Sequence, residues 1–101
     1  MSFDFKKGFQ IYYESDKQRM FPDNWLYSEE HSNENRMVFL AYDASLYPLP
    51  DIKTWRPHAI KETCEKVAEL FKNCDKEIYL DGYLLDKTTK KLSKNQLKDW
   101  F

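Results

Sequence analysis

The sequence predicts one α+β domain, with helices packed on an antiparallel or mixed sheet of about four to five strands. Three observations lead to this fold class. Apolar residues recur at helical spacing after residue 57, short aromatic and β-branched runs flank that segment, and an Asp-Gly pair separates two apolar arms. A chain of 101 residues has room for one domain with a real core, so residues 1–101 are expected to form a single unit.

The first strands are expected in the N-terminal half. Residues 9–13, Phe-Gln-Ile-Tyr-Tyr, have the aromatic and β-branched content of a strand. The polar stretch 14–24 indicates a turn or loop, and residues 24–28 predict a second short strand. Residues 29–35 contain no apolar residue and predict an exposed loop. Residues 36–43 are nearly all apolar, which predicts a strand buried on both faces and therefore central in its sheet.

A strand-to-helix crossing follows. Pro48 and Pro50 end the strand because proline donates no ladder hydrogen bond. Asp51 or Thr54 is expected to cap the next helix, and Pro57 suits its first turn. The spacings of four, three, four and three predict one apolar stripe on a long amphipathic helix over about residues 57–73, formed by Ile60, Cys64, Val67, Phe71 and Cys74.

The C-terminal third predicts a hairpin and a short helix. Asp81-Gly82 between apolar arms is a strong hairpin signal, although one longer strand with a bulge at Gly82 is an alternative. Residues 93–96, Ser-Lys-Asn-Gln, match a capping box, with Ser93 as the cap and Gln96 reaching back. This motif predicts a helix over about residues 94–101.

Composition excludes several functions. Two glycines are too few for a Walker loop or a dinucleotide fingerprint. No apolar run reaches membrane-spanning length and the N-terminus lacks a signal-like stretch, so we expect no membrane association and a cytoplasmic location. Aromatic residues make up 17% of the chain, more than so small a core needs, and exposed aromatics are common interface anchors.

The sequence contains no motif that identifies a catalysed reaction. The histidines and cysteines, His31, His58, Cys64 and Cys74, lack zinc-site spacing and a nucleophile motif, so neither a metal nor another cofactor is expected. Acidic residues at strand ends are ordinary turn formers. Whether the chain is an enzyme is left open, and catalysis is not the expectation.

The preferred hypothesis is a non-enzymatic protein-binding module, of the kind found among inhibitors, immunity proteins and bacterial or phage-encoded modulators. Residues 14–34 carry six acids and two bases, a net charge of −4, with aromatic residues interleaved. This acidic surface predicts a basic partner, such as a nuclease or another nucleic-acid-binding protein. The predicted contact residues are Phe21, Asp23, Trp25, Tyr27, Glu29 and Glu30.

Two alternatives remain. Asp43, Arg56 and His58 gather around the crossing, where a helix N-terminus favours anions, so a small enzyme or an anion-binding or ligand-binding protein is the first. The second is nucleic-acid binding through residues 87–101, which contain five lysines and one aspartate and so have a net charge of +4. The overall charge of −1 and the lack of a nucleic-acid-binding motif argue against direct nucleic-acid contact. The oligomeric state is left open.

Overall fold

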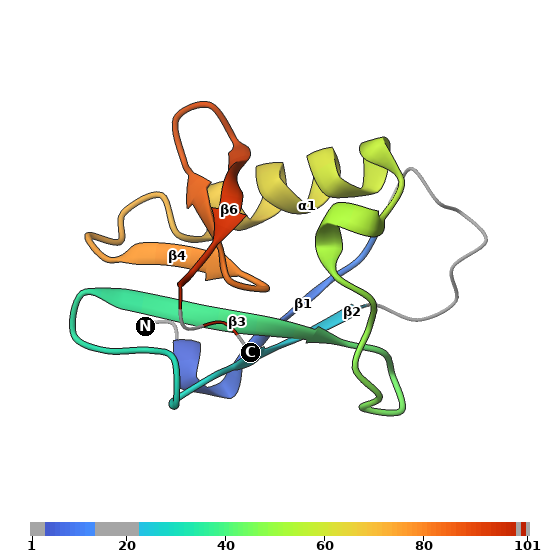
Figure 1. Cartoon of the computed structure of the whole chain (residues 1–101), viewed down its shortest axis with the longest axis horizontal. Helices are drawn as coiled ribbons and strands as arrows, with labels where there is room; N and C mark the ends of the chain where they lie inside the picture. The colour runs from blue at the N-terminus through green and yellow to red at the C-terminus, as the bar shows by residue number, and fades with distance from the viewer. Residues whose placement is uncertain (1–3, 14–22, 99, 101) are drawn as a thin grey trace.

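The computed structural model describes residues 4–13, 23–98 and 100, which form a six-stranded mixed sheet and one α-helix (Figure 1). The strands lie side by side in the order β1-β2-β3-β4-β5-β6, so their order in space follows their order in the chain. The elements are η1 (Phe5–Lys7), β1 (Phe9–Ile11), β2 (Asp23–Tyr27), β3 (Arg36–Tyr42), η2 (Ile52–Thr54), α1 (Pro57–Leu70), β4 (Glu77–Leu80), β5 (Tyr83–Asp86) and β6 (Lys91–Gln96).

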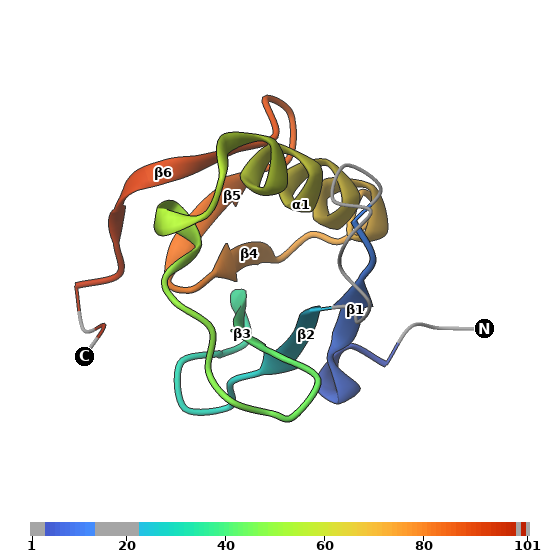
Figure 2. The same ribbon diagram turned by 90° about the vertical axis from the view of Figure 1, so that its right-hand side faces the viewer.

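The sheet is antiparallel except where β3 runs parallel to β4. A parallel pair needs a long crossover connection, and residues 43–76 provide it with η2 and α1. In Figure 2 the strands follow an arc and α1 lies across the open side of that arc. The arc brings β6, at one edge of the sheet, into contact with the helix.

Strand β3 is the centre of the fold, as its apolar sequence predicts. It pairs with β2 on one side and with β4 on the other. Its residues Met37, Phe39 and Ala41 belong to the main core, and Val38, on the opposite face of the strand, is also fully buried. Burial of neighbouring residues on both faces explains why this strand lacks the polar alternation of a half-exposed strand.

The amphipathic helix α1 is also confirmed. Pro57 is its first residue, and Arg56 occupies the N-cap position without a side-chain cap. Of the predicted apolar stripe, Cys64, Val67 and Phe71 are buried. The helix ends at Leu70, three residues before the predicted end. The other two stripe residues are half-buried against the core: Ile60 within the helix and Cys74 beyond its end.

The Asp-Gly pair forms the tight hairpin between β4 and β5. Asp81 and Gly82 have φ values of 54° and 86°, the left-handed conformations that a two-residue hairpin turn requires at both central positions. A Cβ atom added at Gly82 would lie 2.6 Å from Cδ2 of Trp100. Glycine therefore serves both the backbone conformation and the close approach of an aromatic ring.

The predicted C-terminal helix is wrong, because residues 91–96 form β6 and add a strand to the predicted sheet of four or five. Ser93 Oγ accepts a hydrogen bond from Leu84 N in β5 and donates one to Asn95 O. Gln96 Nε2 donates to Asp51 Oδ2 and to Asp81 O. The two capping-box side chains bond to distant parts of the fold, so these tertiary partners override the local helix signal.

The turn at Gly82 gives a testable prediction. Gly82→Ala should lower the free energy of unfolding by about 2 kcal/mol, since alanine adds left-handed strain and displaces Trp100. Gly82→Asn should cost less because asparagine tolerates the left-handed region. Urea unfolding followed by circular dichroism measures both losses. In a Trp100→Ala background, the part of each loss that comes from displacing Trp100 should be smaller. Equal losses for alanine and asparagine would show that φ is not the cause.

Candidate functional site

The crossing between β3 and α1 is held in place by a buried carboxylate from the β4–β5 turn. Asp81 Oδ2 accepts a hydrogen bond from Ile52 N at 3.0 Å, and Asp81 Oδ1 accepts one from Ala41 N at 3.4 Å. The backbone N–H of Asp81 in turn donates to Phe39 O. One side chain thus joins the hairpin turn, the end of β3 and the start of η2, three segments that are far apart in sequence.

A second carboxylate lies beside the first. Asp51 Oδ1 accepts from Lys53 N and so caps η2, while Asp51 Oδ2 accepts from Tyr83 Oη at 3.0 Å and from Gln96 Nε2 at 3.1 Å. Asp51, Asp81 and Gln96 border a cavity of about 240 Å³. Each of the four carboxylate oxygens accepts at least one hydrogen bond from the fold, so this acid pair organises the crossing.

Burial changes the ionisation of Asp81. It raises the pKa of the Asp81 carboxyl from 3.8 to about 6, against the lowering effect of the N–H groups of Ile52 and Ala41, and the nearby Asp51 raises it further. Burial and the hydrogen bond to Asp51 also raise the pKa of the Tyr83 hydroxyl. The Asp81 carboxyl is therefore more easily protonated than an exposed carboxyl group is.

The loop that leaves β3 exposes two neighbouring apolar side chains. Leu46 and Tyr47 retain 61% and 70% of their accessible surface. The loop is nevertheless tightly hydrogen-bonded, because Asp43 Oδ1 accepts from Ser45 N at 2.8 Å and from Tyr47 N at 3.0 Å. The backbone adds bonds from Asp43 N to Tyr47 O and from Leu46 N to Asp43 O. We call residues 43–47 the Leu46–Tyr47 loop.

Leu46 occupies a conformation that leucine rarely adopts. Its φ is 65°, in the left-handed region, which costs roughly 1–2 kcal/mol for a residue with a Cβ. Burial of its own side chain does not offset this cost, because Leu46 is mostly exposed. Asp81 and Lys90 share this left-handed conformation, but Leu46 differs from both in being an exposed apolar residue.

The sequence-predicted ligand site is divided by the structure. Arg56 and His58 are exposed and lie with Trp55 around a shallow depression of about 340 Å³ at the start of α1. Asp43, the third predicted residue, is not among the described residues that line it. Its carboxylate instead organises the Leu46–Tyr47 loop. The three residues therefore do not form one cluster.

The predicted partner-binding residues are divided in the same way. Phe21 lies outside the described residues. Asp23 and Trp25 are buried, with Trp25 fully enclosed, and Tyr27 is half-buried. These three alternate along β2 and so share one face, which is the core face, where Trp25 contacts the rings of Phe9 and Trp55.

The expected surface position of these residues is corrected in one respect. The aromatic residue expected on the surface, Trp25, is a core residue, and the exposed apolar pair lies instead at Leu46 and Tyr47. Glu29 and Glu30 do occupy exposed positions, in the turn that follows β2.

Some of the site residues that were not predicted could have been recognised from the sequence, and others could not. Leu46 and Tyr47 stand between a strand and two prolines, which is a visible sign of an apolar loop. The pairing of Asp51 with Asp81 and Gln96 has no local signal, because these residues come from separate segments.

The described ranges contain neither a metal-binding cluster nor a membrane-spanning helix. There, no group of three or more histidine, cysteine or acidic side chains is placed to hold a metal ion. Likewise, none of the helices in the described part of the chain has the length and apolar character to cross a membrane. Comparison with protein-family models, curated proteins and solved structures gave no match.

The Asp81 carboxyl gives a prediction for pH. Its pKa in the fold, about 6, exceeds the ordinary 3.8, so protonation favours the folded state. The stability it contributes is fully present below about pH 4 and is lost as the pH rises through about 6. The unfolding free energy of the wild type, relative to Asp81→Asn, should fall by up to about 3 kcal/mol between about pH 4 and pH 7.5 in urea titrations.

Asp86 provides the opposite control. N–H groups of Thr89 and Thr88 lower the pKa of the Asp86 carboxyl, so its contribution to stability is lost on acidification. The difference between the wild type and Asp86→Asn should therefore increase with pH. A difference for Asp81→Asn that is flat, or that increases with pH, would contradict the assigned role of burial.

Proposed function

We propose that this chain is a non-catalytic protein-binding module, of the inhibitor, immunity or modulator type, and that the Leu46–Tyr47 loop is its main anchor. The observation that carries the proposal is an exposed Leu-Tyr pair, with Leu46 in a left-handed conformation, on a loop fixed by its own hydrogen bonds.

The loop has the properties of an interface anchor. Tyrosine is enriched among residues whose truncation weakens binding most, and an exposed aromatic ring beside an aliphatic side chain supplies apolar contact area. The hydrogen bonds to Asp43 hold the loop before any partner arrives. A preorganised loop loses little conformational entropy on binding, so more of the contact energy appears as affinity.

Photo-crosslinking tests the proposal directly. A benzophenone amino acid placed at Tyr47, in cells of the source organism, should give a discrete crosslinked product with one protein. The same amino acid at Leu70, which is also an exposed apolar position at 41%, is the matched control on α1. A product that forms equally at both positions, or at neither, would overturn the assignment of this loop.

Substitutions in the loop should separate binding from folding. With the crosslinked partner purified, Tyr47→Ala should raise the Kd about 30-fold in calorimetric titrations, as expected for an anchor worth about 2 kcal/mol. Tyr12→Ala, at another exposed tyrosine, should change it less than about threefold. An unchanged Kd for Tyr47→Ala would refute the anchor.

Leu46→Gly tests the strain separately. Glycine adopts the left-handed region without a penalty, so relief of strain should offset the greater freedom of the unfolded chain. We expect the free energy of unfolding to stay level or to rise by up to about 1 kcal/mol, while the Kd for the partner increases. A clear loss of stability would show that the Leu46 side chain serves the fold.

The acidic turn is a second proposed contact. Glu29, Glu30 and Glu34 are exposed between β2 and β3, at the opposite end of β3 from the Leu46–Tyr47 loop. Three exposed carboxylates in one short connection would attract a basic partner and accelerate its approach.

Charge reversal tests this acidic turn. Glu29→Lys with Glu30→Lys should slow association and flatten its dependence on salt in stopped-flow measurements. Glu69→Lys with Asp75→Lys makes the same change in net charge at exposed positions elsewhere. Equal effects from both double variants would show that net charge, and not this turn, governs association.

A further inference from the structure

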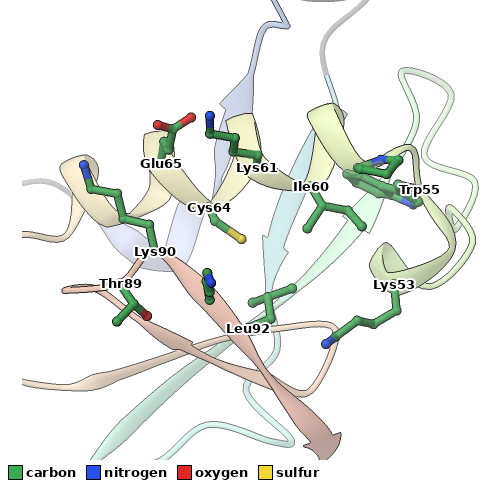
Figure 3. Close-up of a pocket in the computed structure, with 11 residues that line it drawn as sticks. Lys53, Trp55, Ile60, Lys61, Cys64, Glu65, Thr89, Lys90 and Leu92 are labelled. Carbon is green, nitrogen blue, oxygen red and sulfur yellow. The ribbon is translucent and has the colours of Figure 1, made fainter.

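A groove of about 580 Å³ runs between α1 and β6 (Figure 3). Its apolar lining comes from Trp55, Ile60, Cys64 and Leu92, and Figure 3 shows Leu92 rising from β6 toward the helix. Trp55 is fixed at one end because its Nε1 donates a hydrogen bond to Pro50 O at 2.9 Å. The volume lies within the range of ordinary ligand sites.

Lysines border this apolar floor. Lys53, Lys61, Lys90 and Lys91 line the groove against a single acid, Glu65, which leaves a local charge of +3 on a chain whose total is −1. Among the described residues, none of the four ammonium groups forms an ion pair, and Lys53 Nζ lies 4.9 Å from the ring centre of Tyr83. The groove therefore combines apolar surface with positive charge that the fold does not neutralise.

The floor itself is neutral. Burial raises the pKa of the Cys64 thiol to about 11, so the sulfur carries no charge at physiological pH. Cys64 thus lines the groove as a small apolar side chain and not as a nucleophile.

The strand beside the groove has an open edge. β6 is the last strand of the sheet, and within the described residues it pairs with β5 alone. An edge strand leaves backbone N–H and C=O groups that can pair with an added strand. Extended peptides bind to exposed sheet edges of this kind by strand addition, with neighbouring pockets taking their side chains.

We propose that the groove between α1 and β6 binds an extended acidic peptide segment of a partner protein, which pairs with the edge of β6 and places apolar side chains on the groove floor. Charge complementarity with Lys53, Lys61, Lys90 and Lys91 selects the acidic sequence. This site is separate from the Leu46–Tyr47 loop, and it goes beyond the function proposed above.

The groove favours a peptide over a nucleic acid. A single-stranded nucleic acid needs several aromatic faces for its bases, and Trp55 is the one aromatic ring among the described lining residues. Lys87 is also committed to the fold, since its Nζ donates to the backbone oxygens of Phe71 and Cys74. The lysines left beside the groove surround an apolar floor, which suits carboxylates alternating with apolar side chains.

Selection from a phage library of random seven-residue peptides, on the immobilised full chain, tests the proposal. Selected peptides should combine acidic with apolar residues and should not be retained by Lys90→Glu with Lys91→Glu. Amide resonances of β6 should shift on addition of a selected peptide, and their hydrogen exchange should slow. Basic consensus sequences, or selection that is unaffected by the double variant, would overturn the proposal.

Fluorescence anisotropy with a labelled selected peptide then gives the magnitude. Lys90→Glu with Lys91→Glu should weaken binding at least about tenfold, since it replaces two attractive charges by repulsive ones. Lys6→Glu with Lys7→Glu, in η1 at the far edge of the sheet, makes the same change in net charge and should alter the Kd less than about twofold.

Competing ligands and the loop variant complete the test. An oligothymidylate or oleate that displaces the peptide and binds more tightly would assign the groove to nucleic acid or to a small amphipathic anion, and would overturn the peptide. Tyr47→Ala should leave peptide affinity unchanged. Failure of the groove test therefore leaves the Leu46–Tyr47 loop standing, and failure of the crosslinking test leaves the groove standing.

Discussion

The architecture depends on a carboxylate buried where three segments meet. The N–H groups of Ala41 and Ile52 point into the interior and need acceptors, and Asp81 supplies both oxygens. The arrangement costs the desolvation of a charge, which is seen in the raised pKa of the Asp81 carboxyl. Because β3 and β4 are parallel, the chain must cross between them, and Asp81 fixes the first part of that crossing, at Ile52, to the hairpin turn between β4 and β5.

Both proposed binding features depend on this anchored crossing. On one side of the anchor point, the chain forms the Leu46–Tyr47 loop. On the other side, it forms η2 and then provides Lys53 and Trp55 to the groove. A shift of η2 would move two of the residues that line the groove, so the acid pair of Asp51 and Asp81 positions residues of the proposed binding groove.

The elements predicted correctly are those whose signals are local. The apolar run of β3, the stripe of α1 and the Asp-Gly turn each depend on residues that are adjacent or one helical turn apart. The C-terminal helix failed because Ser93 and Gln96 have the local pattern of a cap but bond to residues 9 and 45 positions away. The prediction that Trp25 lies on the surface was wrong for a related reason. Aromatic content does not reveal which face of a strand meets the core, and pairing with β1 and β3 decides that. The meeting of Asp51 with Asp81 follows from the curl of the sheet, which no short pattern encodes.

The net charge of −1 is the sum of surfaces with opposite local charge. Three glutamates occupy the turn between β2 and β3, whereas the groove beside β6 has a charge of +3, and the Leu46–Tyr47 loop tip is apolar. Long-range charge chiefly governs how fast a partner arrives and which partners are rejected, while buried apolar contacts govern how slowly it leaves. A basic partner would therefore be steered to the turn and repelled from the groove, and an acidic segment would experience the reverse. In the proposed scheme, this separation would let one small domain discriminate between partners of opposite charge, and the apolar loop tip and groove floor would set how long each complex lasts.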